Sequence, residues 1–360
     1  MEAANGGVVD SILHVPYAAT VRVMLASLER NLLPDAVVRR LTRLLLASRL
    51  RSGYRPSAET QLSDLVHFAH SLREMPIAIK TEEPKYQHYE VPTSFFKLVL
   101  GKHLKYRQIS QQILKFVVFF FCKRERGIFF DSNVSADRAL WMAFCSCCFF
   151  KDKSGTLEDA EKAMLELYCE RSQIKTDTLD LELQNVEIIV ADISTFEMEA
   201  SYDRIFSIEM FEHMKNYHDL LKKISGWMKP DSLLFVHYFC HKAFAYHFED
   251  VNDDDWITRY FFTGGTMPSA NLLLYFQDDV SIVNHWLLNG KHYAQTSEEW
   301  LKRMDRNSGL IKAIMESTYG KDSAVKWTVY WRTFFIAVAE LFGYSNGEEW
   351  MVAHFLFKKN

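Results

Sequence analysis

The sequence contains little glycine and proline, and it lacks a long uninterrupted hydrophobic run. Its 360 residues include 14 Gly and 8 Pro, which is too few for a fibrous or low-complexity protein. The longest apolar stretch, residues 113–122, is interrupted by Lys115 and is shorter than the ~20 residues that span a bilayer. The chain also opens without a basic segment followed by an apolar one, which favours a cytoplasmic protein over a secreted one.

Neither sign of charge dominates the chain. Lys and Arg number 42 against 46 Asp and Glu, so the net charge is −4 and no basic field is present to bind nucleic acid. Apolar residues make up 48% and charged residues 24%, the balance of a globular rather than a disordered protein. The length suggests two domains, or one domain with a helical extension.

The six cysteines form no paired C-x-x-C motifs, so the common zinc signatures are absent. Cys145, Cys147 and Cys148 are close enough in sequence to bind a soft metal. Reduced thiols in a cytosolic protein are the simpler interpretation, and we expect no metal site.

Helical and strand patterns follow one another along the chain. Apolar residues at spacings of three and four predict helices at residues 34–53, 61–75, 157–170 and 217–227. Short apolar runs predict strands at residues 186–190, 204–208, 233–238 and 351–358. Strands that alternate with helices predict an α/β fold whose parallel sheet is covered on both faces.

Three polar residues follow the strand expected at residues 204–208. Glu209, Glu212 and His213 are spaced i, i+3 and i+4, so they share one face if they lie on a helical turn. Two carboxylates beside an imidazole suit the removal of a proton from an amine. The alternative is an exposed helix start, where the helix dipole favours acidic residues.

The segment YDRIFSIEMFEHM, residues 202–214, resembles the strand-four region of methyltransferases of the cyclopropane-fatty-acid-synthase type. Within that group the chain looks most similar to the plant N-methyltransferases of benzylisoquinoline alkaloid biosynthesis. The similarity continues from Glu187 to Lys359 and also covers residues 88–106. It implies transfer of a methyl group from S-adenosyl-L-methionine to the secondary amine of an alkaloid such as coclaurine. A homodimer is left open.

Two stretches depart from the family pattern. Residues 107–145 form an insert between Tyr106 and Ser146, and its composition resembles translated intron sequence more than an evolved loop. After Ile174 the family has a glycine-rich turn of the D-x-G-C-G-W-G kind, but no G-x-G occurs anywhere in this chain. The resemblance implies that roughly 45 residues are missing there, including the central first strand of the sheet.

These departures define the expected architecture. The fold class is α/β, with a Rossmann-like methyltransferase sheet that is incomplete at its first strands. We expect an N-terminal helical region at residues 1–106 and an atypical insert at 107–145. Residues 146–360 would form a truncated methyltransferase core, with a helical and aromatic substrate cap inserted at about 241–335.

The resemblance also assigns residues to the two ligands. For the methyl donor, whose adenine is recognised by an acid after a strand, the candidates are Tyr106, Ser146, Asp192, Ile193 and Ile208. For the alkaloid amine, which carboxylates and aromatic rings can bind, the candidates are Tyr89, Glu90, His237, Tyr260, Phe261, Tyr293, Trp331 and Phe335. The alternatives are a helix N-cap for Asp192, a surface acid for Glu90, and helix packing for each aromatic residue.

His237 and Tyr293 match positions that bind bicarbonate in the lipid-modifying members of the group. The cysteine that those members use would fall near Val338, so a cyclopropane-synthase-like activity is the weaker alternative. A stronger rival is a catalytically dead splice variant or faulty gene product that serves only as an interaction partner. Because a glycine turn and helix N-terminus normally hold the donor, we expect this chain to bind it weakly. Without the first strand, we also expect exposed strand edges.

Overall fold

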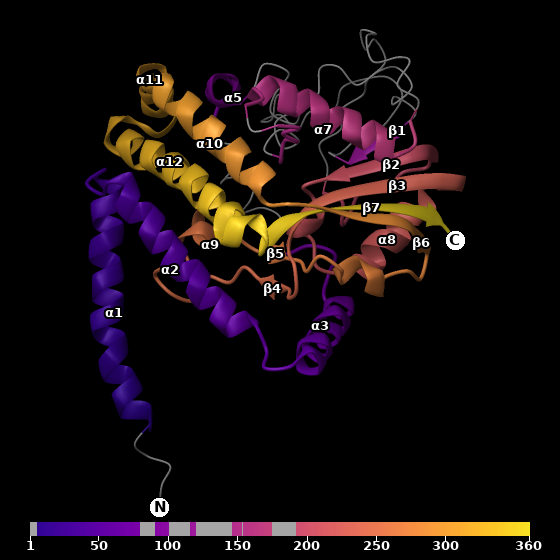
Figure 1. The fold of residues 1–360 in the computed structure, drawn as a ribbon, viewed down its shortest axis with the longest axis horizontal. Coiled ribbons are helices and arrows are strands. Elements are labelled where there is room, and N and C mark those ends of the chain that lie inside the picture. The colour runs from indigo at the N-terminus through magenta and orange to yellow at the C-terminus, as the bar shows by residue number, and fades with distance from the viewer. Residues whose placement is uncertain (1–5, 80–90, 101–115, 120–145, 153, 175–191) are drawn as a thin grey trace, which may run out of the picture.

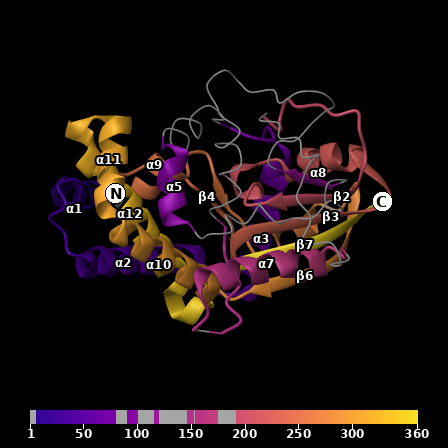
Figure 2. The same ribbon diagram turned by 90° about the horizontal axis from the view of Figure 1, so that it is seen from above.

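The computed structural model describes residues 6–79, 91–100, 116–119, 146–152, 154–174 and 192–360. A five-stranded sheet occupies one end of the molecule, and a group of long helices occupies the other (Figure 1). The view from above shows the same separation, with α1, α2, α10, α11 and α12 gathered beyond the end of the sheet (Figure 2).

The sheet is mixed rather than fully parallel. Its strand order is β1-β2-β3-β7-β6, with bounds Phe116–Phe119, Tyr202–Ile208, Met228–His241, Trp350–Lys359 and Val280–Leu288. Strands β1, β2 and β3 are parallel, but β7 is antiparallel to both β3 and β6. The prediction of a parallel sheet is therefore wrong for strands β7 and β6. Strand β6 was missed because its partly exposed residues lack a continuous apolar run.

Strand β1 comes from the insert. Its four residues pair in parallel with residues 204–207 of β2, on the side of β2 away from β3. The expectation of exposed strand edges is therefore wrong for this edge of β2. The predicted strand at 186–190 and the other insert residues lie outside the described part of the chain.

Each face of the sheet carries its own hydrophobic core. Along β3, Leu233, Phe235 and Phe239 belong to one core, and Leu234, Val236 and Tyr238 belong to the other. This alternation is the two-residue period of a strand that is buried on both faces. Helix α7 (Leu157–Arg171) lies on the first face, and helix α8 (Tyr217–Gly226) packs on the second (Figure 1).

The helices begin and end close to where the sequence predicted. Helix α3 starts three residues earlier than expected, at Ala58, because Ser57 forms a capping box with Thr60. The other helices are α1 (Gly6–Glu29), α2 (Asp35–Gly53), α5 (Thr93–Val99), α9 (Trp256–Phe261), α10 (Lys291–Arg306), α11 (Ser308–Tyr319) and α12 (Lys321–Gly343). The short elements are η2 (Phe211–His213), η3 (Leu272–Tyr275), η4 (Tyr344–Gly347), β4 (Tyr246–His247) and β5 (Thr266–Met267).

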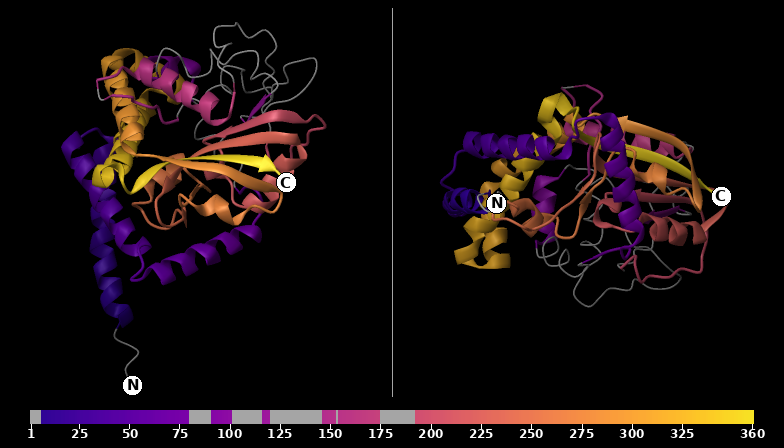
Figure 3. Two further views of the ribbon diagram at one scale, coloured as in Figure 1. Left: turned by 45° about the vertical axis from the view of Figure 1, so that its right-hand side comes forward. Right: turned by 90° about the horizontal axis from the view of Figure 1, so that it is seen from below.

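Charged pairs attach the N-terminal helices to the C-terminal ones. On α2, Arg39 donates to Glu298 at 2.6 Å and to Glu340 at 2.9 Å. Arg332 of α12 donates to Asp35 at 2.7 Å and to Asp305 at 2.6 Å. Helix α1 crosses this group and extends away from the body of the molecule (Figure 3). Helices α1 and α2 thus lie against the C-terminal helices, whereas Leu65, Ala69 and Leu72 of α3 belong to the core on the second face of the sheet.

Candidate functional site

Glu209 follows directly after strand β2 in a strained conformation. Its φ is 53°, in the left-handed region that a residue other than glycine rarely adopts. The backbone N–H of Glu209 donates to the carbonyl of His237 at 3.0 Å, which holds this conformation. Such strain is concentrated at functional sites. The helical turn that we predicted for residues 209–213 is therefore wrong, because only Phe211–His213 are helical and they form a 3-10 turn.

Glu212 is fully buried beneath Glu209. Its Oε1 accepts a hydrogen bond of 2.8 Å from the backbone N–H of Phe239. Burial, and then the charge of Glu209, raise the pKa of Glu212 well above its usual range, which favours the neutral form of its carboxyl group. The alternative of an exposed helix start is thus wrong for Glu212. Its Oε2 has no hydrogen-bond partner among the described residues.

His213 lies on the same 3-10 turn and stacks on Phe262. The two rings are 6.1 Å apart between centroids and nearly parallel. Phe262 in turn contacts Phe239 edge-on at 5.6 Å and Phe248 at 5.1 Å. The imidazole therefore stands between the end of β2 and the aromatic cap.

A buried lysine holds the loop that carries Phe262. Lys215 donates to the carbonyl of Gly265 and to Thr266, each at 2.8 Å, and burial lowers its pKa to about 8. The loop is folded so tightly that a Cβ on Gly265 would lie only 3.2 Å from the Phe262 carbonyl oxygen and 3.2 Å from the Phe248 ring. Glycine is therefore the residue that fits there.

His237 connects the carboxylate pair to helix α7. It is fully buried, and its Nε2 lies 2.8 Å from Oε1 of Glu209. Its Nδ1 lies 3.1 Å from the hydroxyl of Tyr168, which also hydrogen-bonds to Ser146. Ile208 is paired with His237 across β2 and β3. The structure thus brings together Glu209, His237, Ser146 and Ile208, which the sequence had assigned to different ligands.

The residues predicted to bind the adenine of the methyl donor, Asp192 and Ile193, begin a turn after the undescribed residues 175–191. Ile193 is buried, with 3% of its surface exposed. Asp192 Oδ1 caps its own turn by accepting from the backbone N–H and the hydroxyl of Ser194, at 2.9 and 2.6 Å. Its Oδ2 makes no hydrogen bond to the described residues and suits an amino donor. Tyr106 lies outside the described residues, and so do the predicted substrate residues Tyr89 and Glu90.

The predicted aromatic residues lie in the cap and its junction with the sheet. Phe261 stacks on Phe334 at 4.5 Å and meets Trp331 at 5.3 Å. Trp331, which is 1% exposed, also contacts Phe335, so these rings form one buried cluster. The remaining contacts join Tyr260 to Tyr330 at 4.6 Å and Tyr293 to Phe342 at 4.4 Å. Helix packing, the alternative for these residues, accounts for the buried positions.

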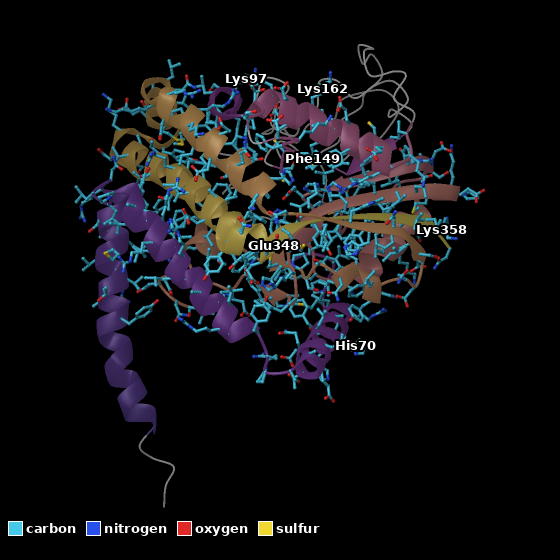
Figure 4. The ribbon with its side chains drawn as sticks, viewed as in Figure 1. His70, Lys97, Phe149, Lys162, Glu348 and Lys358 are labelled. Atoms are coloured by element: carbon cyan, nitrogen blue, oxygen red, sulfur yellow. The ribbon has the colours of Figure 1, made fainter. Side chains whose placement is uncertain are left out.

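Side chains fill the space between the helices and the sheet (Figure 4). Phe149 lies between α7 and α10, where its backbone N–H donates to Ala160 and its ring meets His292 at 4.8 Å. Cys147 and Cys148 are buried free thiols there, and Cys145 lies outside the described residues. Within the described ranges no group of three potential ligands is placed to hold a metal ion. None of the helices in those ranges combines the length and hydropathy of a membrane-spanning segment.

Several residues that shape the site escaped the sequence analysis. They are Tyr168, Arg171, Phe239, Phe262 and His354. One signal was available, because His354 stands within the apolar run MVAHFLF and a buried polar residue needs a partner. The others are aromatic or charged residues on ordinary elements, and nothing in their local sequence marks them.

Comparison with known proteins agrees with this geometry. Residues 175–342 match the family described as mycolic acid cyclopropane synthetase. An (S)-coclaurine N-methyltransferase of Thalictrum flavum subsp. glaucum is 42% identical over 96% of this chain and 97% of that protein. A second, from Papaver somniferum, is 40% identical over 93% and 97%. A crystal structure of coclaurine N-methyltransferase bound to N-methylheliamine and SAH is 40% identical, with a TM-score of 0.79, covering 94% of this chain and 100% of that one.

The lengths of these alignments reveal a gap in this chain. The Thalictrum alignment has 390 positions, but 96% of 360 residues supplies only about 346 of them, which leaves about 44 positions without a counterpart here. The Papaver alignment, with 381 positions and 93% coverage, leaves about 46. Both agree in size with the predicted loss of the glycine-rich segment. On fold, site and sequence, the chain belongs to the coclaurine-type N-methyltransferases, which use S-adenosyl-L-methionine as co-substrate.

Proposed function

We propose that this chain methylates the secondary amine of a benzylisoquinoline alkaloid such as coclaurine. Two relatives at 40–42% identity are named for that activity. The observation that carries the proposal is the pair of carboxyl groups at the end of β2. Glu209 and Glu212 are close neighbours there, and burial, followed by the charge of Glu209, raises the pKa of Glu212 well above its usual range. Two adjacent acids whose environments separate their pKa values are typical of proton-transfer sites.

The chemistry requires one base. A secondary amine is mostly protonated near neutral pH, and its nitrogen can attack only after the proton has left. Glu209 attracts the ammonium group by charge and accepts its proton, while His213 lines the same approach. S-adenosyl-L-methionine supplies the methyl group: the nitrogen–carbon bond forms as the sulfur–carbon bond breaks, and S-adenosylhomocysteine leaves. Glu212 does not compete for the proton, because its raised pKa means that it holds a proton of its own.

The aromatic cap suits the rest of such a substrate. Phe262 stacks on His213, so an aromatic wall begins at the catalytic turn itself. An ammonium group over such a ring gains ~0.5–2 kcal/mol before it is deprotonated. The two ring systems of a benzylisoquinoline offer further apolar surface to the cap. Proximity and alignment then complete the catalysis.

Product analysis tests this proposal. The purified chain is incubated with S-adenosyl-L-methionine and either coclaurine, its N-methylated tertiary amine, or a phospholipid with unsaturated acyl chains. The same set is run with a restored chain, in which residues 107–145 are removed and the positions of the Thalictrum relative that have no counterpart here are placed after Lys175. Mass spectrometry should detect N-methylated coclaurine, at least from the restored chain. A modified lipid with unchanged coclaurine would contradict the proposal.

A second candidate is a protein that binds the alkaloid without turning it over. The gap of about 44 aligned positions, together with the absence of any G-x-G, favours it. The residues proposed to bind the amine would then act alone, because those in the described part of the chain lie within 209–354 rather than in the missing segment. We further propose a cytoplasmic location, to which the buried cysteines in the described part of the chain are suited, since none of them forms a disulfide. A homodimer stays a proposal that size measurement in solution can test.

A further inference from the structure

A row of side chains crosses the sheet beside Glu209. His237 of β3 and His354 of β7 are direct partners in register, and Trp286 of β6 is the partner of His354 on its other side. Both histidines are fully buried. Helix α7 covers the row, with Tyr168 over His237 and the guanidinium of Arg171 4.9 Å from the Trp286 ring centre.

The contacts along this row have only one consistent set of donors and acceptors. Arg171 Nη1 lies 2.8 Å from His354 Nδ1. A guanidinium group can only donate, so His354 Nδ1 must accept and carries no proton. The proton of His354 is then on Nε2, which lies 2.8 Å from Nδ1 of His237.

The same reasoning continues to the catalytic carboxylate. Because His354 donates from Nε2, Nδ1 of His237 must accept, and the proton of His237 is on Nε2. That N–H points at Oε1 of Glu209 over 2.8 Å. Both imidazoles are therefore neutral, and every bond in the chain runs from Arg171 towards Glu209.

We propose that Arg171 and His354 are positioning residues for Glu209, which they orient by fixing the tautomer of His237. The inference rests on the proposed function where it treats Glu209 as the base. The N–H of His237 donates to Oε1 of Glu209 and fixes the orientation of the carboxylate, so Oε2 is left to face the amine. Because Arg171 cannot accept a proton, the row orients Glu209 but gives its proton no route to solvent.

Nuclear magnetic resonance of the chain labelled with ¹⁵N-histidine tests the proposal without any turnover. Ring ¹⁵N shifts at pH 7.5 distinguish the two neutral tautomers and the cation. The signals of the two residues are assigned from His237→Asn and His354→Asn. We expect both histidines to be neutral with the proton on Nε2. An Nδ1–H tautomer or an imidazolium at either residue in the unmodified chain overturns the proposal.

Variants of Arg171 and Tyr168 distinguish the effect of the hydrogen bond that Arg171 donates from the effect of side-chain packing. Arg171→Met should release the tautomer of His354, whereas Arg171→Lys keeps a donor and should preserve it. Tyr168→Phe removes a neighbouring hydroxyl but not the row, so the tautomers should stay as they are. An unchanged His354 signal in a folded Arg171→Met chain would contradict the role of Arg171.

Kinetics of the restored chain give a second readout. Arg171→Met should lower kcat roughly 10- to 100-fold with little change in the KM of the amine, and Arg171→Lys should recover most of it. Equal kcat values for the three forms would overturn the positioning role. If no form methylates an amine, the proposed function fails, while the tautomers still decide whether the row is built as described.

Discussion

The amine side and the donor side of this protein meet at the end of strand β2, but they retain the family pattern to different degrees. On the amine side, Glu209, Glu212, His213 and His237 are held by short contacts and by two cores. On the donor side, the described residues supply Asp192 and Ile193, whereas the glycine-rich turn is absent from the sequence.

The difference teaches that the two halves of the site are built by separate segments. The amine side depends on residues 209–354, which fold against one another across β3, β7 and the cap. The donor side depends on a turn between two strands of the sheet. A change confined to the segment after Ile174 can therefore remove one ligand and leave the residues for the other in place.

The largest effect that would sharpen this comparison is expected from Glu209→Gln. In the restored chain the variant should lower turnover about 10²- to 10⁴-fold, because a neutral amide cannot take the proton. Glu212→Gln is the matched control, since the raised pKa of Glu212 favours its neutral form and a Gln side chain can still accept from the Phe239 N–H. Kinetics with the secondary amine measure both. Equal losses in the two variants would show that Glu209 and Glu212 do not differ in role.

His213→Ala should produce the next largest effect. We expect at least a tenfold loss of turnover in the restored chain, because the imidazole completes the group that handles the proton. Titration with S-adenosylhomocysteine should give nearly the same affinity before and after the change. Phe262→Leu keeps an apolar contact under His213 and serves as the control. A parallel loss of donor affinity in His213→Ala would instead assign His213 to the donor side.

The smallest expected effect is the dependence of the chain's stability on pH through Glu212. The folded chain raises the pKa of Glu212, mainly by burial, so above the usual pKa the unfolded state binds fewer protons than the folded state. The stability of the unmodified chain should therefore fall, through this group, as pH rises from 5 to 8. Glu212→Gln lacks this loss, so its Tm should rise relative to that of the unmodified chain as pH increases. The matching change in the free energy of unfolding is at most about 1.4 kcal/mol per pH unit.

Glu170→Gln, on the exposed face of α7, controls for the loss of one negative charge. It should show the same pH dependence as the unmodified chain. A constant difference in Tm between Glu212→Gln and the unmodified chain would mean that Glu212 is ionised in the fold.

The sequence predicted the elements that carry the site but not the conformation at its centre. Strand β2, helix α8 and strand β3 follow from local patterns, and the cluster from Glu209 to His213 follows from spacing. The left-handed turn at Glu209 could not be predicted, because a bond to the carbonyl of His237, 28 residues away, holds it. Propensity alone favours the helical turn that we expected.

Contacts that depend on the register of the strands could not be predicted from the sequence either. His237 and His354 are 117 residues apart, and they meet only because β7 pairs with β3 in one register. A shift of one residue would place His354 on the other face of the sheet. The neutral state of Glu212 depends in the same way on burial beneath segments that are distant in sequence.

Separate titrations of the purified, unmodified chain with its two ligands test the central claim most directly. One adenine hydrogen bond contributes about 1 kcal/mol, whereas micromolar affinity needs about 8 kcal/mol. We therefore expect coclaurine to bind measurably, with loss of binding in Glu209→Gln, and S-adenosylhomocysteine to bind more weakly than roughly 100 μM. A dissociation constant for S-adenosylhomocysteine in the tens of micromolar or below would contradict the account, because the donor side would then be complete without the glycine-rich segment.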